Sequence, residues 1–576
     1  MTEMNTRFIY RMLWMWLLAA GMVLGALAQP CGSPALTKMA SGFGENLVVF
    51  TDRSIYTVNE TLRFSALLQS SGASYQGLGS RILYAELVNA AGGSVARGKY
   101  PLENNRSAGS LSIPSSLPSG MYYLRSYTRW MRNFRPENFS YLPIRILNPY
   151  SDEKEVVPSS SGIHPLEAVP GQNGMVAISL DKAAYSAGDT VKVEFSLNSA
   201  GMAQFEFGCL TVAPSGAVDT SAFLFRVDPG ISDYPPFEWR FFPELNGTSI
   251  SGVVVDTNEG KPVSGVRVHM SILGEDPTYL VADSDGQGKF LFNTPYRTGF
   301  QEMFVVPEHP ETTPVEVLID NDFASDALPF LPGTLDLDFE EKQLASRLSL
   351  NMQLKETFLT DSVLNDSPSE YTASLPFYGT PQISILLDEF VSLPNMEEVI
   401  ENLLPRTFVV RNGEEVGFLI KSDNPLISMF PPLILVDHIP VFDMEAILSI
   451  PPNKIRQIDV IPEVYVVGAI KYGGIISLSS QQGDLASIKL PEASYFFDFM
   501  SVQADMVSKR ARYPGTGKIP DMRNTLHWNE HFELHKDSQN RISFQASSVP
   551  GGYVILFRGI LPEGDMVFGI QHFRVE

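Results

Sequence analysis

The residues best suited to chemistry are three histidines and a glutamate near residue 530. His527, Glu530 and His531 have the spacing H-x-x-E-H, and His535 follows four residues later. On an α-helix the first two histidines would lie about 6 Å apart and could share a zinc ion, whereas on a strand they would lie about 13 Å apart. Asparagines and aromatic residues interrupt the segment, so we expect a strand without a metal. Zinc hydrolysis is kept as a second alternative function.

Other groups that could act as nucleophiles or as acid–base pairs lack a suitable setting. No G-x-S-x-G elbow, phosphate-binding loop or dinucleotide fingerprint occurs in a strand–helix context. Carboxylate pairs begin at Asp388, Glu397 and Glu414, but adjacent side chains on a strand point to opposite faces. Cys31 lies in the N-terminal tail and Cys209 in an apolar run typical of a core strand; a disulfide between them is permitted after export but not indicated. We therefore predict no catalytic, cofactor-binding or metal-binding residues.

The charge of the chain bears on its partners. Acidic residues outnumber basic ones by 65 to 42, which gives a net charge of −23 over 576 residues. Such a chain repels nucleic-acid phosphates and does not dock on anionic lipid through a basic patch. We expect protein partners and no nucleic acid, and peripheral membrane association is left open. The hydrophobic content of 44% is typical of a folded protein, and the length suits roughly three to five domains.

The N-terminal residues 1–28 have the parts of a secretory signal peptide. Arg7 and Arg11 precede an apolar run, which ends in the small-x-small sequence Ala26-Leu27-Ala28. We expect cleavage near Gln29, export, and a location in the periplasm or at the outer membrane.

A repeat organises the first half of the chain. The segment Asp52–Leu62 recurs as Asp181–Val191, and each copy leads from a turn into a strand of alternating hydrophobicity. The pattern resembles the strand entry of macroglobulin-type β-sandwiches, with Asn59 in place of the usual glycine. The resemblance implies macroglobulin-like sandwiches over residues 40–150 and 172–246.

The next segment has the turns of another sandwich. Gly260-Lys261-Pro262 and Asp285-Gly286 separate alternating strands, and residues 247–322 resemble the regulatory-like β-sandwich of carboxypeptidases. Residues 323–375 are expected to form a linker, in which residues 340–359 suit either a helix or a strand pair.

Residues 376–485 have a more diagnostic pattern. A buried strand, a tight turn, a second strand and a Tyr-Gly-Gly strand resemble the plug domain of TonB-dependent outer-membrane receptors, with His438 where the family has glycine. A receptor barrel needs about twenty-two strands of about ten residues, whereas 576 − 478 = 98 residues follow Leu478, so we expect a plug-like domain without a barrel. The resemblance implies an interaction surface at Val436, Asp437, His438, Pro440, Tyr472, Gly473 and Gly474.

The last segment, 515–576, is expected to form a closing macroglobulin-like sandwich because its Pro-Gly-x-Tyr turn repeats the turn at 118–122. The fold class is therefore mainly β, with tandem β-sandwiches and a small α+β plug-like domain. This order resembles Bacteroidetes cell-envelope proteins. The implied function is non-enzymatic, as a binding scaffold or adaptor for other envelope proteins, including outer-membrane transport components.

An alternative from a different class is a macroglobulin-like protein that binds proteases. Neither cysteine lies in the Gly-Cys-Gly-Glu-Gln segment that covalent trapping requires. Such a protein would instead depend on a cleavable loop, for which the segment 151–174 is the candidate.

Overall fold

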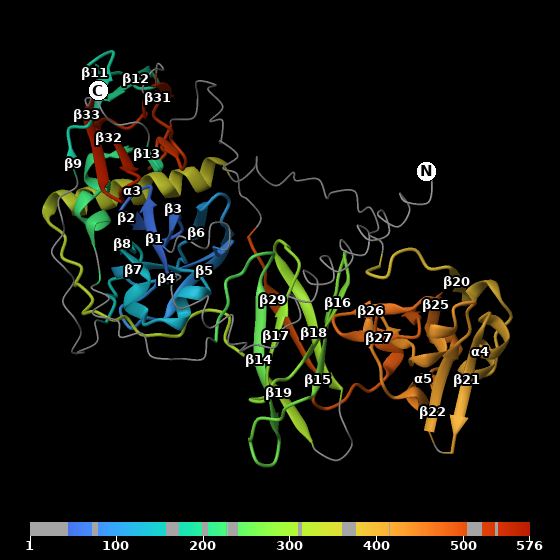
Figure 1. Ribbon diagram of the computed structural model, residues 1–576. Helices are drawn as coiled ribbons and strands as arrows, with labels where there is room; N and C mark the ends of the chain where they lie inside the picture. Colours follow the sequence, from blue (N-terminus) through green and yellow to red (C-terminus); the bar gives the residue numbers. More distant parts are fainter. Residues whose placement is uncertain are drawn as a thin grey trace, which may run out of the picture.

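The fold comes from a computed structural model, which describes residues 44–71, 79–156, 172–197, 205–225, 227, 240–308, 314–359, 376–413, 415–503, 521–535 and 540–576. It is mainly β, as expected, with three two-layered sandwiches and one smaller α/β domain, which lies beyond the third sandwich (Figure 1). None of the helices in these residues is long and apolar enough to cross a membrane. The expected signal peptide 1–28 and Cys31 lie outside the described residues.

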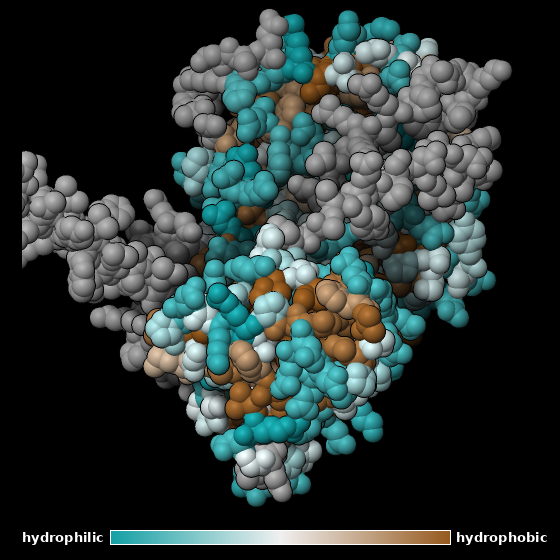
Figure 2. Space-filling view, turned by 90° about the vertical axis from the view of Figure 1, so that its right-hand side faces the viewer, coloured by the Kyte–Doolittle hydropathy of each residue, from teal (hydrophilic) through white to brown (hydrophobic). Residues whose placement is uncertain are grey.

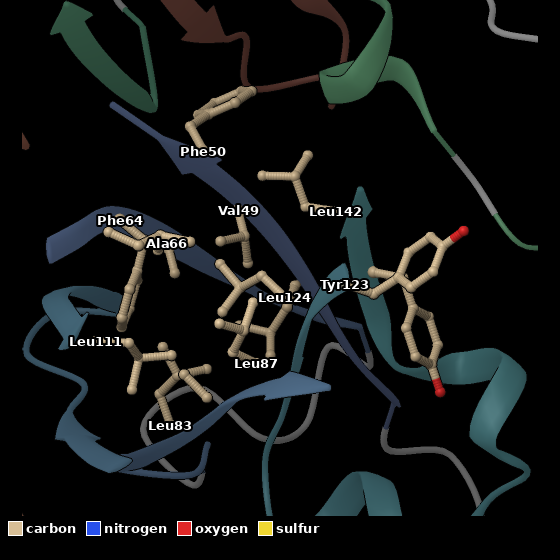
Figure 3. Packing of buried hydrophobic residues seen from close by; sticks show 14 of the residues in the cluster. Val49, Phe50, Phe64, Ala66, Leu83, Leu87, Leu111, Tyr123, Leu124 and Leu142 are labelled. Atoms are coloured by element: carbon tan, nitrogen blue, oxygen red, sulfur yellow. The ribbon is translucent and has the colours of Figure 1, made fainter. Parts of the chain in front are cut away.

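Sandwich A comprises residues 44–147. One sheet has the order β1 (Gly44–Thr51), β3 (Thr61–Ser71) and β6 (Arg106–Ser112), and the other has the order β2 (Ile55–Thr57), β8 (Ser140–Leu147), β7 (Gly120–Tyr127), β4 (Ile82–Val88) and β5 (Ser94–Pro101). The two sheets pack face to face around one apolar core. All seven residues of β4 are buried, so the outer face of the second sheet is covered as well. Figure 3 shows Val49 of the first sheet packed near Leu87 and Leu124 of the second.

Sandwich B is built from two distant parts of the sequence. One sheet has the order β10 (Val176–Leu180), β12 (Thr190–Leu197) and β31 (Asn540–Gln545). The other has the order β11 (Ala184–Tyr185), β33 (Met566–Val575), β32 (Gly551–Ile560), β13 (Phe207–Pro214) and β30 (His527–Asn529), and β9 (Gln172–Asn173) also pairs with β33. The structure thus differs from the expectation of separate sandwiches over 172–246 and 515–576. Each part supplies strands to both sheets, and their apolar faces form one core.

Sandwich C also takes a strand from later in the chain. The first sheet has the order β17 (Lys289–Asn293), β14 (Ser249–Asp256) and β19 (Val315–Ile319). The second has the order β16 (Thr278–Asp283), β15 (Arg267–Ile272), β18 (Phe300–Glu308) and β29 (Tyr495–Met500). The fourth strand of the second sheet therefore lies beyond the expected boundary at residue 322. Its Phe499 is buried in the core of the sandwich.

The α/β domain, residues 383–488, is inserted ahead of β29. Its sheet has the order β20 (Ile383–Leu386), β25 (Ile455–Ile461), β28 (Ile475–Ser480), β23 (Leu433–Val436), β24 (Ile439–Pro440). Helices α4 (Met396–Leu403) and α5 (Met444–Leu448) and the hairpin β21 (Thr407–Asn412)–β22 (Glu415–Ile420) contribute to its core, and β26 (Tyr465–Val467) pairs with β27 (Ile470–Tyr472).

The expected linker 323–375 begins with an ordered segment that returns to sandwich A. The N–H of Gly333 donates to the Tyr123 hydroxyl (2.8 Å), and Arg125 donates to the carbonyl of Asp326 (2.7 Å). Helix α3 (Phe339–Leu359) follows, so the open choice over 340–359 resolves to a helix. Its Leu344 and Leu348 pack with residues of sandwiches A and B, and Figure 1 shows α3 between the two.

The sequence repeat corresponds to a repeated structural corner. The Tyr56 hydroxyl donates to the Asp52 carboxylate (2.7 Å), which also accepts from the N–H of Arg63 (3.0 Å). In sandwich B, Tyr185 donates to Asp181 (2.6 Å), which accepts from the N–H of Lys192 (3.1 Å). In each copy the strand that carries the tyrosine pairs in parallel with the last strand of its sheet, β8 or β33.

The two corners differ in what covers them. In sandwich A, the Thr525 hydroxyl of sandwich B donates to Asp52 (2.5 Å), and Asn524 donates to Glu60 (2.7 Å). Asp52 and Arg53 are therefore buried, whereas Asp181 and Lys182 are exposed. The first corner is part of the A–B interface, and the second faces solvent.

This difference predicts unequal effects for two equivalent substitutions. Tyr56→Phe removes a hydroxyl whose partners are sealed from water, so we expect it to lower the free energy of unfolding by about 2–3 kcal/mol. Tyr185→Phe should cost about 1 kcal/mol, because water can replace the hydroxyl at the exposed Asp181. Urea unfolding of the two variants beside the wild type provides the measurement. Equal losses would contradict the assignment of the first corner to a sealed interface.

Candidate functional site

The H-x-x-E-H segment adopts an extended conformation. His527–Asn529 forms β30 and pairs with β13, and Glu530 and His531 follow in a turn. The strand prediction is therefore confirmed, and the helical geometry that two zinc-binding histidines would need is not present. Across the described ranges, no group of three or more His, Cys, Asp or Glu side chains could hold a metal ion.

Cys209 behaves as a core residue of β13. Its thiol is free and fully buried, and burial raises its pKa to about 11. A thiol with a raised pKa is a poor nucleophile at neutral pH. The segment proposed as a cleavable loop, 151–174, falls largely on residues 157–171, which lie outside the described residues.

The predicted strand–turn–strand of the plug-like motif is present, and its turn has an unusual backbone. Asp437 and His438 connect β23 to β24 with φ values of 48° and 67°. Both central residues of this hairpin turn thus lie in the left-handed region, which explains why glycine would be favoured at the second position. The Asp437 carboxylate stabilises the turn because it accepts from the N–H groups of Ser480 (2.7 Å) and Leu485 (2.9 Å).

The motif residues do not form an exposed surface. Val436, Pro440, Tyr472, Gly473 and Gly474 are buried, and only Asp437 and His438 are half-buried. The side chains of β23 alternate between two cores: Ile434 and Val436 face α4 and α5, whereas Leu433 and Leu435 pack with residues of β16 in sandwich C. The motif therefore supports contacts within this chain.

Polar contacts cross the interface between sandwich C and the α/β domain. The Ser271 hydroxyl donates to the carbonyl of His438 (2.8 Å), and the Tyr279 and Tyr472 hydroxyls lie 3.0 Å apart. On the sandwich side, His269 Nδ1 lies 2.7 Å from the Tyr279 hydroxyl, and its Nε2 lies 3.3 Å from the Glu308 carboxylate. A continuous hydrogen-bonded chain thus links Glu308 to Tyr472.

Neutral His269 satisfies this chain. With its proton on Nε2, the ring donates to Glu308 and accepts from Tyr279, whose oxygen can in turn accept from Tyr472. The side chain of His269 is fully buried, and burial lowers its pKa. The hydrogen bond from His269 lowers the pKa of Glu308. Protonation of His269 would make both ring nitrogens hydrogen-bond donors. The Tyr279 hydroxyl would then have to accept from Nδ1 instead of donating to it.

The two glycines of the motif permit a close approach of backbones. A Cβ on Gly473 would lie 2.1 Å from the carbonyl oxygen of Phe430 and 2.2 Å from that of Ile427. Ile427 belongs to the 3-10 helix η6 (Pro425–Met429), and Phe430 follows it directly. Gly474 has φ +98°, and a Cβ there would lie 2.6 Å from the carbonyl oxygen of Ile461. Their roles are structural.

The opposite face of the α/β domain is apolar and exposed. Nine of the twenty large apolar residues that are exposed in the described part of the chain belong to this domain, so apolar exposure concentrates there. Phe442 lies on the sandwich side, with its ring centre 4.7 Å from that of His269, and the others are Leu386, Phe390, Val391, Phe408, Val410, Leu426, Met429 and Val466. Figure 2 looks onto the end of the molecule formed by this domain, and apolar side chains gather there. Contiguous exposed apolar surface is typical of interaction sites.

A groove of about 380 Å³ lies within this outward face. Val410, Gly417 and Leu419 of the β21–β22 hairpin line one side, and Met429, Phe430 and Pro431 line the other. Sequence reasoning missed this site. The signal was present in Asn412-Gly413, a dipeptide typical of hairpin turns, between two apolar runs.

The comparisons with known proteins do not assign a family. No family model and no curated protein matches the chain. Among solved structures, native Escherichia coli α2-macroglobulin matches with a TM-score of 0.23 and 10% identity, over 93% of this chain and 40% of that chain. Methylamine-reacted Salmonella α2-macroglobulin gives 0.21 and 11%, over 93% and 40%. Latent PorU from Porphyromonas gingivalis gives 0.16 and 10%, over 48% and 34%.

This chain thus spans less than half the length of the macroglobulins that it matches. At these identities and TM-scores, the matches are too distant to decide a function.

The close packing at Gly473 leads to a prediction with an internal control. Gly473→Ala forces a methyl group onto two carbonyl oxygens, and we expect a loss of about 3 kcal/mol in the free energy of unfolding. Gly417→Ala, on the outward face with open space around its Cβ, should change it by less than about 1 kcal/mol. Urea unfolding of both variants tests this, and a tolerated Gly473→Ala would contradict the described contact.

The buried His269 predicts a pH dependence. The unfolded chain takes up a proton at this residue near pH 6.5 while the folded chain resists it, so stability falls as the pH drops from about 7 to 5, by at most about 1.4 kcal/mol per pH unit. Glutamine does not titrate, so the His269→Gln variant should lose less of its free energy of unfolding than the wild type over this pH range. The measurement is the free energy of unfolding at pH 7.5, 6.5 and 5.5, and an unchanged slope in the variant would disprove the contribution of His269.

Proposed function

We propose that this chain is an exported, non-enzymatic binding protein of a bacterial cell envelope, which presents the α/β domain to another envelope protein. The observation that supports the proposal most directly is the apolar outward face of this domain, which holds the exposed Phe408, Val410 and Met429. Burying such a face on a partner removes apolar surface from water, which is the main driving force of protein association.

The arrangement of the domains suits a scaffold. The α/β domain is fixed to sandwich C by an apolar and hydrogen-bonded interface, and the plug-like motif of 432–478 is used within that interface. A partner that binds the outward face would therefore meet a surface held in a defined orientation. Rigid presentation lowers the entropy lost on binding.

The proposal predicts that a few exposed side chains determine partner capture. Full-length chain with Phe408→Ser, Val410→Ser and Met429→Ser should lose its specific partners in crosslinked affinity capture from the native cell envelope. A matched variant with Phe300→Ser and Ile570→Ser removes exposed apolar residues from sandwiches C and B and should retain them. The same partners in both variants would refute a binding role for this face.

A further inference from the structure

The β21–β22 hairpin has a free edge beside the groove. Lys421 N–H donates to the carbonyl of Arg406 (2.8 Å), and the register continues with Phe408 opposite Leu419 and Val410 opposite Gly417. Because hydrogen-bonded pairs alternate in an antiparallel ladder, these are the bonded pairs, and the intervening residues direct their N–H and C=O groups outward. On β22 the outward groups belong to Val416 and Phe418.

Two common protections are absent from this edge. No strand within the described residues pairs with the outer edge of β22, and the strand has neither a proline nor a lysine before residue 421. Unpaired edges of this kind are templates for an added strand. The groove between β22 and residues 428–431 lies where such a strand would enter.

The side chains around the groove define what the added strand would present. Gly417 leaves open space opposite Val410, and Met429 is exposed across the groove, so apolar side chains fit on this face. The charges nearby are mixed: Glu398, Glu401, Asp423, Asp443 and Glu445 are exposed on α4, α5 and the adjoining loops, against Arg406, Arg411, Lys421 and Lys471, whose ammonium lies 5.9 Å from the ring centre of Phe430. The chain as a whole carries a net charge of −23.

We infer that the outer edge of β22 is a strand-addition site for an extended partner segment that alternates apolar and basic residues. Main-chain hydrogen bonds to Val416 and Phe418 would supply affinity, and the apolar groove and the acidic net charge of the chain would supply specificity. A second copy of this chain is a poorer occupant, because two copies that each carry a net charge of −23 repel each other. The inference rests on the proposed binding role of this face and names its partner class.

The test uses the full-length chain and a labelled peptide, acetyl-Lys-Val-Lys-Val-Lys-Val-Lys-amide, in fluorescence anisotropy titrations. We expect saturable binding that weakens about tenfold or more between 50 and 500 mM NaCl, since the charge attraction is screened. The same peptide with alternate amides N-methylated should bind at least about tenfold more weakly, and its glutamate counterpart should not bind. Deuterium uptake at residues 416–420 should fall on binding.

Two proline variants locate the edge. Val416→Pro removes an outward N–H from β22 and should weaken the peptide about tenfold or more, whereas Val409→Pro makes the same change on the outer edge of β21 and should leave affinity within about twofold. Should either variant unfold, the N-methylated peptide decides between strand addition and side-chain contact.

Several results would overturn the inference: no binding of the lysine peptide at 1 mM, equal binding of its N-methylated form, equal binding to Val416→Pro, or a self-association that Val416→Pro abolishes. If the peptide fails while capture of envelope partners still depends on Phe408, Val410 and Met429, strand addition is wrong and the proposed binding role stands. If both fail, the binding role falls as well.

Discussion

The fold of this chain depends on hydrogen bonds between strands that lie far apart in the sequence. A buried strand must find partners for its N–H and C=O groups, and here those partners come from distant sequence. Sandwich B is completed by β31–β33, which pair with β12 and β13, and sandwich C receives β29 from beyond the α/β domain in the sequence. The α/β domain is consequently an insertion between β19 and β29 of sandwich C, and these strands fix where the chain enters and leaves the domain.

Buried charges reinforce the points where the returning segments meet. Lys99 of β5 is fully buried, with its ammonium 2.6 Å from the Asp322 carboxylate and 3.8 Å from the ring centre of Phe499 on β29. Three parts of the chain thus converge on one cation. Such a pair adds little net stability, but separating it is costly because an unpaired charge would remain buried. It therefore favours one arrangement of sandwiches A and C over looser ones.

Local features of this fold could be read from the sequence, and non-local ones could not. The repeat at Asp52 and Asp181 and the turn at Asp437-His438 are encoded by neighbouring residues, and both appear as expected. The union of 172–225 with 521–576 depends on which strands meet across more than 300 residues, which alternation alone does not specify. For the same reason, the pattern around Tyr472 predicted a strand correctly but could not show that its hydroxyl would face Tyr279 of another domain.

The two faces of the α/β domain explain why the resemblance to receptor plugs was an incomplete guide to its surface. Apolar residues on both sides of β23 satisfy the sequence pattern, yet one side is used against α4 and α5 and the other against sandwich C. What remains for a partner is the hairpin, where Phe408 and Val410 alternate with the core-facing Val409. A hairpin that packs one face inward and leaves its other face and an edge open has the two properties that recognition of an extended strand requires, a backbone template and room for alternate side chains. The physical case for binding therefore lies in the hairpin.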